Sequence, residues 1–556
     1  MLKIYKKIIV LILIFTALLS ISAVSAEMND TLELEDNNHD SSIYIDNQKG
    51  NDFNAGDITS PVKSISQAVN NAENNSDIYL SSDTYSGDKN TRITVDKSLN
   101  FIGNNTVIDG EGKNYLFTIT GNVNVTFKNI HFINAYKSPE SYSVNYPDSV
   151  YGSALEIKNA NVILDNCTFQ SNVLDYSNNN RNIYGGAISN DGTLIVTHSK
   201  FLLNVAHSTS GLFSYGGSIY NAGKLIINQS EFLKSDSDDF SYGGVIANNG
   251  DLTIENTLMA NSKSSQESRG GVVYNTGNFK LTNSIIENSV ISKANFQYVY
   301  GAIYNAGTFT AYSNIFRNNT GVYSTPSRGS PTIYSTGKLN LTYNLFLGNV
   351  PFEEDIYKDV YISSGEIVSL DNNWWGSNDN PTTVNAVNLD DEINSWLVLN
   401  ITPDYCALNI GQSVDINVNW ASNLPVEFNR NLIPKSEIII NANTHNFTNQ
   451  LTYNYGETHV KGLYQIPVIL NDFLKIVEID VGKIKTELNI SLNDNLTYGD
   501  DLIVDISING EDNLNPEGII LISIGDNVYN ITLENGHGEC PKLVNYVILI
   551  TKMDIT

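Results

Sequence analysis

One segment of about twenty residues recurs through the middle of the chain, and it limits the possible folds more than any other feature. Most copies open with Tyr-Gly-Gly or a close variant, and the copies start at Tyr151, Tyr184, Tyr215, Tyr242, Arg269, Tyr300 and Pro331. A spacing of roughly thirty residues is typical of a solenoid or an array. A single repeat cannot bury its apolar side, whereas stacked repeats bury it continuously.

Each copy contains the same short features in the same order. A Gly pair leads into an apolar strand, and an Asn-x-Gly triplet follows, as in Asn190/Gly192 and Asn221/Gly223. Gly and Asn tolerate positive φ, so we predict a sharp reversal at this triplet. An alternating run rich in β-branched residues comes next and predicts a second strand.

A large apolar residue closes each copy, and a polar residue lies three positions further on. We expect like residues to stack along the solenoid, with apolar side chains inside and Asn side chains joined in amide ladders. The predicted apolar ladder is Phe169, Phe201, Phe232, Leu258, Ile285, Phe316 and Phe346. The predicted polar ladder is Asn172, Asn204, Ser235, Asn261, Asn288, Asn319 and Asn349.

These features predict an all-β fold with a right-handed parallel β-helix over residues 43–396. Leucine-rich repeats would need shorter units with regular Leu, and propeller blades would need longer units with four strands. Ser64 is a candidate N-cap for an amphipathic helix that would cover the first coil, with Ile65, Ala68, Val69 and Ala72 at helical spacing. Trp374 falls where the apolar ladder would continue, so the Trp374-Trp375 pair should close the last coil.

The flanking regions differ in composition from the repeats. Residues 1–26 have lysines, an apolar run and a small-residue cleavage site at Val24-Ser25-Ala26, which indicates a signal peptide, the alternative being an uncleaved anchor. Residues 27–42 are acidic and polar and predict a disordered leader. Short alternating strands predict an Ig-like β-sandwich over 397–482 and a second Ig-like repeat over 483–556, which we expect to be truncated or frameshifted at its end.

Variable loops lie at the same place in each repeat, so we expect them to cluster on one side of the solenoid as a binding face, centred on residues 206–299. Tyrosine supplies rigid contact area with a polar tip, which suits carbohydrate or protein ligands. The candidate binding residues in these loops are Tyr142, Tyr146, Tyr176, Phe213, Phe240, Phe296 and Tyr298. The alternative is that each ring only covers the solenoid wall.

Charge and rare residues exclude several classes of function. The net charge of −28 gives no basic surface for nucleic acid. Three cysteines cannot form a disulfide framework, and Cys167 is expected to be a small core residue.

No cofactor motif is present. Acidic turns at Asp46, Asp52 and Asp57 and at Asp109-Gly110-Glu111-Gly112 could bind Ca²⁺, but turns stabilised by side-chain hydrogen bonds are the favoured interpretation. Candidate N-glycosylation sites are Asn104, Asn124, Asn228, Asn318, Asn340, Asn446 and Asn530.

The signal peptide, the YGG-x-I-x-N-x-G repeats, the NWWGSN-x-x-P ending at Asn373 to Pro381 and the trailing strands together resemble the adhesin-like proteins of methanogenic archaea. The repeat region resembles the parallel β-helix superfamily that includes pectate lyases, and the C-terminal units resemble bacterial Ig-like repeats. The resemblance implies a secreted or surface glycoprotein that binds glycans or surface proteins of other cells without catalysis. A polysaccharide lyase or hydrolase acting on an acidic glycan and a structural envelope component are the alternatives.

Overall fold

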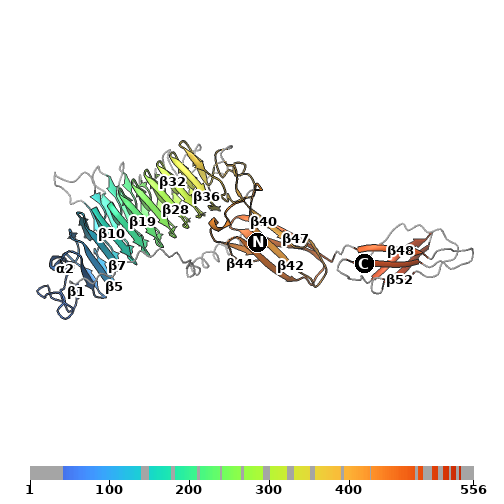
Figure 1. Ribbon diagram of the computed structural model, residues 1–556, viewed down its shortest axis with the longest axis horizontal. Helices are drawn as coiled ribbons and strands as arrows, with labels where there is room; N and C mark the ends of the chain where they lie inside the picture. The colour runs from blue at the N-terminus through green and yellow to red at the C-terminus, as the bar shows by residue number, and fades with distance from the viewer. Residues whose placement is uncertain are drawn as a thin grey trace, which may run out of the picture. The chain divides into compact units, whose positions relative to one another are not determined.

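The structure is a computed structural model, shown in Figure 1. It describes residues 42–138, 150–176, 182–208, 213–237, 241–264, 268–291, 301–321, 331–350, 357–389, 393–425, 427–482, 486–492, 504–510, 518–524, 527–533 and 537–539. The predicted signal peptide and leader therefore lie outside the described residues, except for Ser42.

The repeats form a parallel β-solenoid, as predicted. Successive coils pair in parallel and in register: Leu194 of β14 (Ile188–Thr197) lies opposite Leu225 of β19 (Lys224–Asn228), which lies opposite Leu252 of β24 (Asp251–Glu255). Figure 1 follows the stack from β1 through β10, β19 and β28 to β36. Each sequence repeat therefore forms one coil of the solenoid, and each coil covers the apolar side of the next.

The first coils are built from β1 (Ser42–Ile45), β2 (Ser76–Leu80), β3 (Thr84–Ser86), β4 (Ile93–Val95), β5 (Leu99–Asp109), β6 (Phe117–Thr120) and β7 (Asn124–Ile133). Later coils have two strands before the bend, namely β10 (Leu155–Asp165), β14, β18 (Ile219–Asn221), β19, β23 (Ile246–Asn248), β24, β27 (Val273–Asn275), β28 (Asn278–Thr282), β31 (Ile303–Asn305), β32 (Thr308–Tyr312), β35 (Ile333–Ser335), β36 (Lys338–Thr342), β38 (Val360–Ile362) and β39 (Ile367–Ser369), with β10 and β14 continuous. After the bend come β11 (Thr168–Gln170), β15 (Lys200–Leu202), β20 (Glu231–Leu233), β25 (Leu258–Ala260), β29 (Ile285–Glu287), β33 (Ile315–Arg317) and β37 (Leu345–Leu347).

A short helix covers the N-terminal end of the core, which confirms that prediction. The Ser64 hydroxyl accepts a hydrogen bond from the Gln67 N–H at the start of α2 (Ile65–Asn71). Ile65, Ala68 and Val69 are buried against the first coils. A helix at this position shields an apolar cross-section that would otherwise meet water.

The apolar ladder exists, but two of its predicted members are wrong. Phe232 lies opposite Met259, Met259 opposite Ile286, and Ile286 opposite Phe316. Leu258 and Ile285, which we expected in the ladder, are half-buried on the outer side of β25 and β29. Alternate residues of a strand face opposite sides, so a one-residue error moves the side chain from the core to the surface.

The same one-residue shift corrects the polar ladder. Ser262 and Ser289 are buried in it, whereas Asn261 and Asn288 are exposed and have positive φ of 58° and 51° in the neighbouring bend. Two of the predicted contacts are present: Asn172 Nδ2 donates to Asn204 Oδ1 at 2.9 Å, and Asn319 Nδ2 donates to Asn349 Oδ1 at 3.2 Å. Buried amides are therefore satisfied by their equivalents in the next coil.

The Asn-x-Gly triplet does not adopt the positive φ that we predicted. Gly223 has an ordinary φ, and a Cβ on it would lie 2.0 Å from the Gly192 carbonyl oxygen of the neighbouring coil. Glycine is required here because the stacked backbones approach closely. The Asn makes the turn: Asn190 Oδ1 accepts from the Gly192 N–H, and its Nδ2 donates to Asn221 Oδ1 at 2.7 Å. This second amide ladder continues through Asn248, Asn275 and Asn305.

The two tryptophans at the end of the solenoid face different sides. The Trp375 ring stacks on Phe346 at 4.7 Å and 7°, so Trp375 extends the apolar ladder. Trp374, which we predicted in that place, lies opposite Leu345 and contacts the Trp420 ring at 5.2 Å. A register shift between β36 and β39 places one extra residue before the two tryptophans, which moves Trp374 out of the apolar ladder and Trp375 into it.

Residues 397–482 form two sheets around one buried cluster that includes Trp420 and Val468. One is antiparallel and contains β40 (Leu397–Pro403), β42 (Ser413–Ser422) and β45 (Gln450–Glu457). The other is mixed and contains β41 (Ala407–Leu408), β47 (Phe473–Val481), β46 (Gly462–Leu470), β43 (Ser436–Ile440) and β44 (Asn443–Phe447). The predicted strands are confirmed, while the Ig-like topology stays a prediction.

Residues 486–539 contribute two further antiparallel sheets, one of β48 (Thr486–Leu492), β49 (Val504–Gly510) and β52 (His537–Glu539), the other of β50 (Gly518–Ile524) and β51 (Asn527–Leu533). Residues 540–556, and with them the predicted incomplete end, lie outside the described residues. In the part of the chain that the structure describes, no helix has the length and apolar character to span a membrane.

Candidate functional site: a tyrosine band at the loop roots

Each coil leaves the solenoid wall after the polar ladder and returns just before the Gly pair. The outgoing strands form one parallel sheet: β8 (Tyr136–Lys137), β12 (Val173–Tyr176), β16 (Val205–Ser208), β21 (Asp236–Ser237), β26 (Lys263–Ser264), β30 (Val290–Ile291) and β34 (Thr320–Gly321). The returning strands form another: β9 (Val150–Tyr151), β13 (Ile183–Tyr184), β17 (Ser214–Tyr215) and β22 (Ser241–Tyr242). The variable loops are therefore rooted on one side of the solenoid, as predicted.

The roots of these excursions have a small core of their own. Val150, Leu174, Ile183 and Ala206 form a buried cluster separate from the main core. Side chains alternate along a strand, so the tyrosine after each of Val150 and Ile183 faces away from this cluster. The small core fixes the direction of those tyrosines.

Most of the predicted binding residues cannot be placed. Tyr142, Tyr146, Phe240, Phe296 and Tyr298 lie outside the described residues, as does the side chain of Tyr176 at the end of β12. Phe213 is half-buried, and its ring lies 4.9 Å from that of Tyr242 at the root of an excursion. The Phe213 ring therefore packs against another residue of the same chain.

The structure brings together tyrosines that sequence analysis assigned only to the repeat. The first row consists of the returning-strand residues Tyr151, Tyr184, Tyr215 and Tyr242, whose ring centroids are 5.1, 4.9 and 4.9 Å apart. The second row lies on the wall and consists of Tyr220, Tyr274, Tyr304, Tyr334 and Tyr361, with Ser189 and Ala247 in register among them. We call the two rows together the tyrosine band.

The two rows interlock where the second row has a small residue. In the coil of Ser189, the Tyr184 ring reaches Tyr220 of the next coil at 4.6 Å and 57°. In the coil of Ala247, the Tyr242 ring reaches Tyr274 at 4.7 Å and 43°. A small side chain leaves room for a ring from the other row, and such tilted aromatic pairs are favourable. The rows therefore form one continuous surface.

The first coils of the band are open, Tyr304 and Tyr334 are buried, and Tyr361 at the far end is half-buried. Tyr151, Tyr184, Tyr215, Tyr220, Tyr242 and Tyr274 are half-buried. Tyr304 and Tyr334 are only 7% and 5% exposed. A ligand can therefore reach the band in the coils from Tyr151 to Tyr274.

Three phenols of the band have a raised pKa, and the charged groups beside the band have partners. Burial raises the pKa of Tyr220 to about 12, and it also raises the pKa of Tyr215 and Tyr274. Arg269 takes the place of a fifth tyrosine in the first row, with its guanidinium 5.4 Å from the Tyr242 ring centroid and 5.5 Å from that of Tyr304. These distances place a cation over both aromatic rings.

An ion-pair group lies at the N-terminal end of the band. Lys137 and Lys158 contact the two carboxylate oxygens of Glu156 at 2.8 and 2.7 Å. Burial acts to raise the pKa of Glu156, but the two lysines outweigh it and the pKa is lowered. Glu156 lies opposite Ser189, so this paired carboxylate is in register with the second row.

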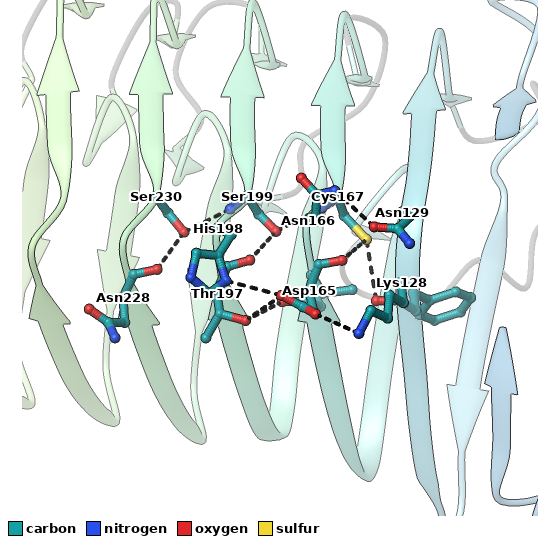
Figure 2. Close-up of polar contacts among 12 residues, drawn as sticks. Lys128, Asn129, Asp165, Asn166, Cys167, Thr197, His198, Ser199, Asn228 and Ser230 are labelled. Carbon is teal, nitrogen blue, oxygen red and sulfur yellow. Dashed lines mark hydrogen bonds and ion pairs between the residues drawn. The ribbon is translucent and has the colours of Figure 1, made fainter. Parts of the chain in front are cut away.

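A separate group on the outer wall resembles acid–base machinery, and Figure 2 shows it. His198 Nδ1 lies 3.1 Å from Asp165 Oδ1, and Lys128 Nζ lies 3.4 Å from Asp165 Oδ2. The nearby Cys167 thiol donates to the Phe127 carbonyl and is 1% exposed, and burial raises its pKa to about 12. The thiol is therefore a protonated core group, as expected for Cys167, and does not act as a nucleophile with His198.

The acidic turns weighed as Ca²⁺ sites are held by side-chain hydrogen bonds. Asp46 Oδ1 accepts from the N–H groups of Gln48 and Lys49, and Asp109 Oδ1 accepts from that of Glu111. Asp57 Oδ1 accepts in the same way from Thr59 and Ser60, and Asp52 Oδ1 from Lys63 and Ser64. The described ranges contain no cluster of three His, Cys, Asp or Glu side chains arranged to hold a metal ion.

The candidate glycosylation sites differ in access. Asn104, Asn124, Asn318, Asn446 and Asn530 are exposed, whereas Asn228 and Asn340 are half-buried. Asn318 Oδ1 accepts a hydrogen bond from Asn471 at 3.3 Å. Glycosylation itself stays a prediction at all seven positions.

No protein-family model and no curated protein matches the chain. Among solved structures, it is similar to a pectate lyase Pel9A at 15% identity, over 64% of this chain and 88% of that one, with a TM-score of 0.30. For a rhamnogalacturonan lyase the values are 11% identity, 55% and 87% coverage and a TM-score of 0.25. For a GH136 lacto-N-biosidase from Eubacterium ramulus they are 9% identity, 59% and 68% coverage and a TM-score of 0.22. Similarity at this level assigns no activity to the chain.

Proposed function

We propose that this is a secreted or cell-surface adhesin-like protein that binds glycans or the surfaces of other cells without breaking bonds. The observation that supports the proposal is the stacking of the excursions. Seven outgoing strands share one sheet and four returning strands share another, so the loops of successive coils start from the same side. The first row of the tyrosine band lies along the returning strands, and repeated loops on one side are a common form of binding surface.

The N-terminal sequence and the sequons support export. Residues 1–26 have the composition of a signal peptide, and five of the seven candidate sequons have exposed asparagines. A strongly acidic chain with no basic surface is suited to extracellular partners other than nucleic acid.

A polysaccharide lyase or hydrolase is the second candidate, and one observation favours it. Lys128, Asp165 and His198 come from three successive coils, and Lys128 and His198 both contact Asp165 on the outer wall. A base and a carboxylate therefore lie together on one sheet surface. General acid–base catalysis needs groups within hydrogen-bonding reach of a substrate, which this surface position allows.

The test compares binding with bond cleavage on the same glycans. The chain from Glu27 onward would be applied to a glycan array and incubated with pectins and neutral polysaccharides, with unsaturated uronates and new reducing ends as readouts. We expect retention on the array with no released product. Release of product that disappears in a Lys128→Ala/His198→Ala variant would replace the adhesin with the enzyme. Self-assembly of the protein with no glycan retained would instead favour a structural envelope component.

A further inference from the structure

Stacking decides which part of each tyrosine in the first row a ligand can reach. Tyr184 lies between Tyr151 and Tyr215, with ring planes only 16° and 13° from parallel. Both faces of the Tyr184 ring are therefore covered by other rings, and a sugar ring cannot stack on them. The ring edge and the phenol hydroxyl remain as contact groups.

The hydroxyls of this row are suited to hydrogen bonding with a ligand. Within the described ranges, no hydrogen bond joins the Tyr184 or Tyr215 hydroxyl to another residue of the chain, and both side chains are half-buried. A neutral phenol can both donate and accept. Tyr184 and Tyr215 thus offer one such group in each of two successive coils.

The spacing of the row selects the shape of the ligand. The rings repeat every 4.9 to 5.1 Å because parallel strands of adjacent coils are spaced at about that distance. A linear polymer lying along the solenoid axis can meet every hydroxyl only if its own units advance by a similar distance. An extended polypeptide advances by about 3.3 Å per residue, so its residues coincide with the row only at every second coil and cannot meet every hydroxyl. An extended polysaccharide has larger units that each carry several hydroxyl groups.

Electrostatics disfavour an anionic ligand. The chain has a net charge of −28, which repels polyanions at long range. Near the band, Glu156 is paired with Lys137 and Lys158, and Arg269 lies over the rings of Tyr242 and Tyr304. These cations already have partners, so they give an acidic glycan little compensation.

We propose that Tyr151, Tyr184 and Tyr215 bind an uncharged, extended polysaccharide that runs along the solenoid axis, through hydrogen bonds with their hydroxyl groups. This inference rests on the proposed glycan-binding function and specifies its ligand and its orientation. Since the contacts repeat once per coil, affinity grows with oligosaccharide length until the ligand spans the coils of Tyr151, Tyr184 and Tyr215.

The experiment removes the hydroxyls and keeps the rings. Titration calorimetry would compare the chain from Glu27 onward with its Tyr151→Phe/Tyr184→Phe/Tyr215→Phe variant, using neutral β-linked gluco-, xylo- and manno-oligosaccharides of increasing length and oligogalacturonates. The matched control is Tyr44→Phe/Tyr79→Phe, because Tyr44 and Tyr79 stack at 5.1 Å and 16°, as Tyr151 and Tyr184 do, but lie outside the band. Circular dichroism would verify folding, with the single Tyr184→Phe variant used if the triple variant unfolds.

In the unmodified chain we expect a neutral series to bind with an affinity that rises up to about three sugar units, one for each of Tyr151, Tyr184 and Tyr215. Each hydroxyl contributes about fivefold, so the triple variant should bind about 100-fold more weakly, while the control stays within about twofold. Unchanged affinity in the triple variant, or preference for oligogalacturonates, would overturn the inference and leave the proposed function standing. Absence of binding to every glycan on the array and in the titrations would remove the glycan-binding function and the inference with it.

Discussion

The core side and the tyrosine side of the same coils both stack aromatic rings, and they do so under different constraints. On the core side, Phe201 has neighbours Phe169 and Phe232 at 4.8 and 4.4 Å, all three rings are nearly parallel, and none is exposed. On the other side, Tyr215 stacks between Tyr184 and Tyr242 and is half-buried. The core must fill a closed volume in every coil, whereas the outer rings need only cover a surface.

This difference explains why the core ladder accepts only substitutions of similar size. Met259 and Ile286 replace phenylalanine in the middle of the ladder, and each remains buried. In the second tyrosine row, Ser189 and Ala247 take the place of a large ring, and a ring from the first row fills the space. Close packing is enforced inside and relaxed outside.

The largest expected effect comes from breaking the stack that both sides share. A Cβ on Gly244 would lie 2.1 Å from the Gly271 carbonyl oxygen, so Gly244→Val should prevent the coils from approaching. We expect no cooperative thermal transition by circular dichroism, with loss of both ladders. The control is Thr253→Val in the same coil, at a half-buried outer position where a β-branched residue suits the strand. A Gly244→Val protein that melts like the parent would refute the stacking contact.

The next prediction compares one ring from each side. Phe201→Ala removes a fully buried ring from between two others, and the cavity should cost about 3–5 kcal/mol of the free energy of unfolding. Tyr215→Ala removes a half-buried ring that water can replace, and we expect about 1–2 kcal/mol. Chemical denaturation measures both. Equal losses would mean that the tyrosine band contributes to the fold as much as the core does.

The corrected register can be tested in one coil with neighbouring residues. Met259 is 1% exposed inside the ladder, while Leu258 is half-buried outside it. Met259→Ser should therefore cost about 3 kcal/mol, and Leu258→Ser less than about 1 kcal/mol. The reverse order would restore the register that the sequence suggested. The midpoints of denaturant unfolding for the two variants settle the matter because the substitutions have similar chemistry.

That register shows what the sequence can and cannot predict. The repeat, the Ser64 cap and the strands after Trp396 follow from local patterns, and the structure has them all. The two errors fall where apolar residues are adjacent, at Leu258-Met259 and Ile285-Ile286, so alternation alone cannot choose between them. The number of residues after the Asn-x-Gly turn identifies the core residue: Phe201 follows Gly192 by nine residues, and Met259 follows Gly250 by nine.

The same count fails at Trp374, which follows Gly365 by nine residues, because the shift between β36 and β39 adds a residue that no local motif reveals. The tyrosine band was missed for another reason. Its two rows come from separate parts of the repeat, Tyr215 before the Gly pair and Tyr220 after it, and only the return of the chain onto the wall brings them together. Loop aromatics such as Tyr142 and Phe296 stay predictions because they lie outside the described residues.

A pH-dependent effect concerns Asp359, a buried carboxyl in the described part of the solenoid core. Asp359 is 1% exposed, and its Oδ1 accepts a hydrogen bond from Asn349 Nδ2 at 3.0 Å. This contact corresponds in position to the contact between Ser218 and Ser235 in an earlier coil. Burial raises the pKa of Asp359 to about 7, while Lys358 and the Asn349 hydrogen bond act in the opposite direction. The folded state therefore favours the protonated acid over the carboxylate.

The sign of the pH dependence follows from that shift. Below about pH 4, Asp359 is protonated in both states and does not affect stability; between about pH 4 and pH 7 only the unfolded chain ionises, so the folded state loses stability as the pH rises. Above about pH 7 the loss levels off, at roughly a few kcal/mol. Asp359→Asn keeps the size of the side chain and should remove this component. The measurement is the difference in unfolding free energy between the two proteins across pH 4–8, since other titrating groups cancel in it. A difference that does not vary with pH would mean that the Asp359 carboxyl is as readily ionised inside the solenoid as in water, and the core side would then be less closed than its rings indicate.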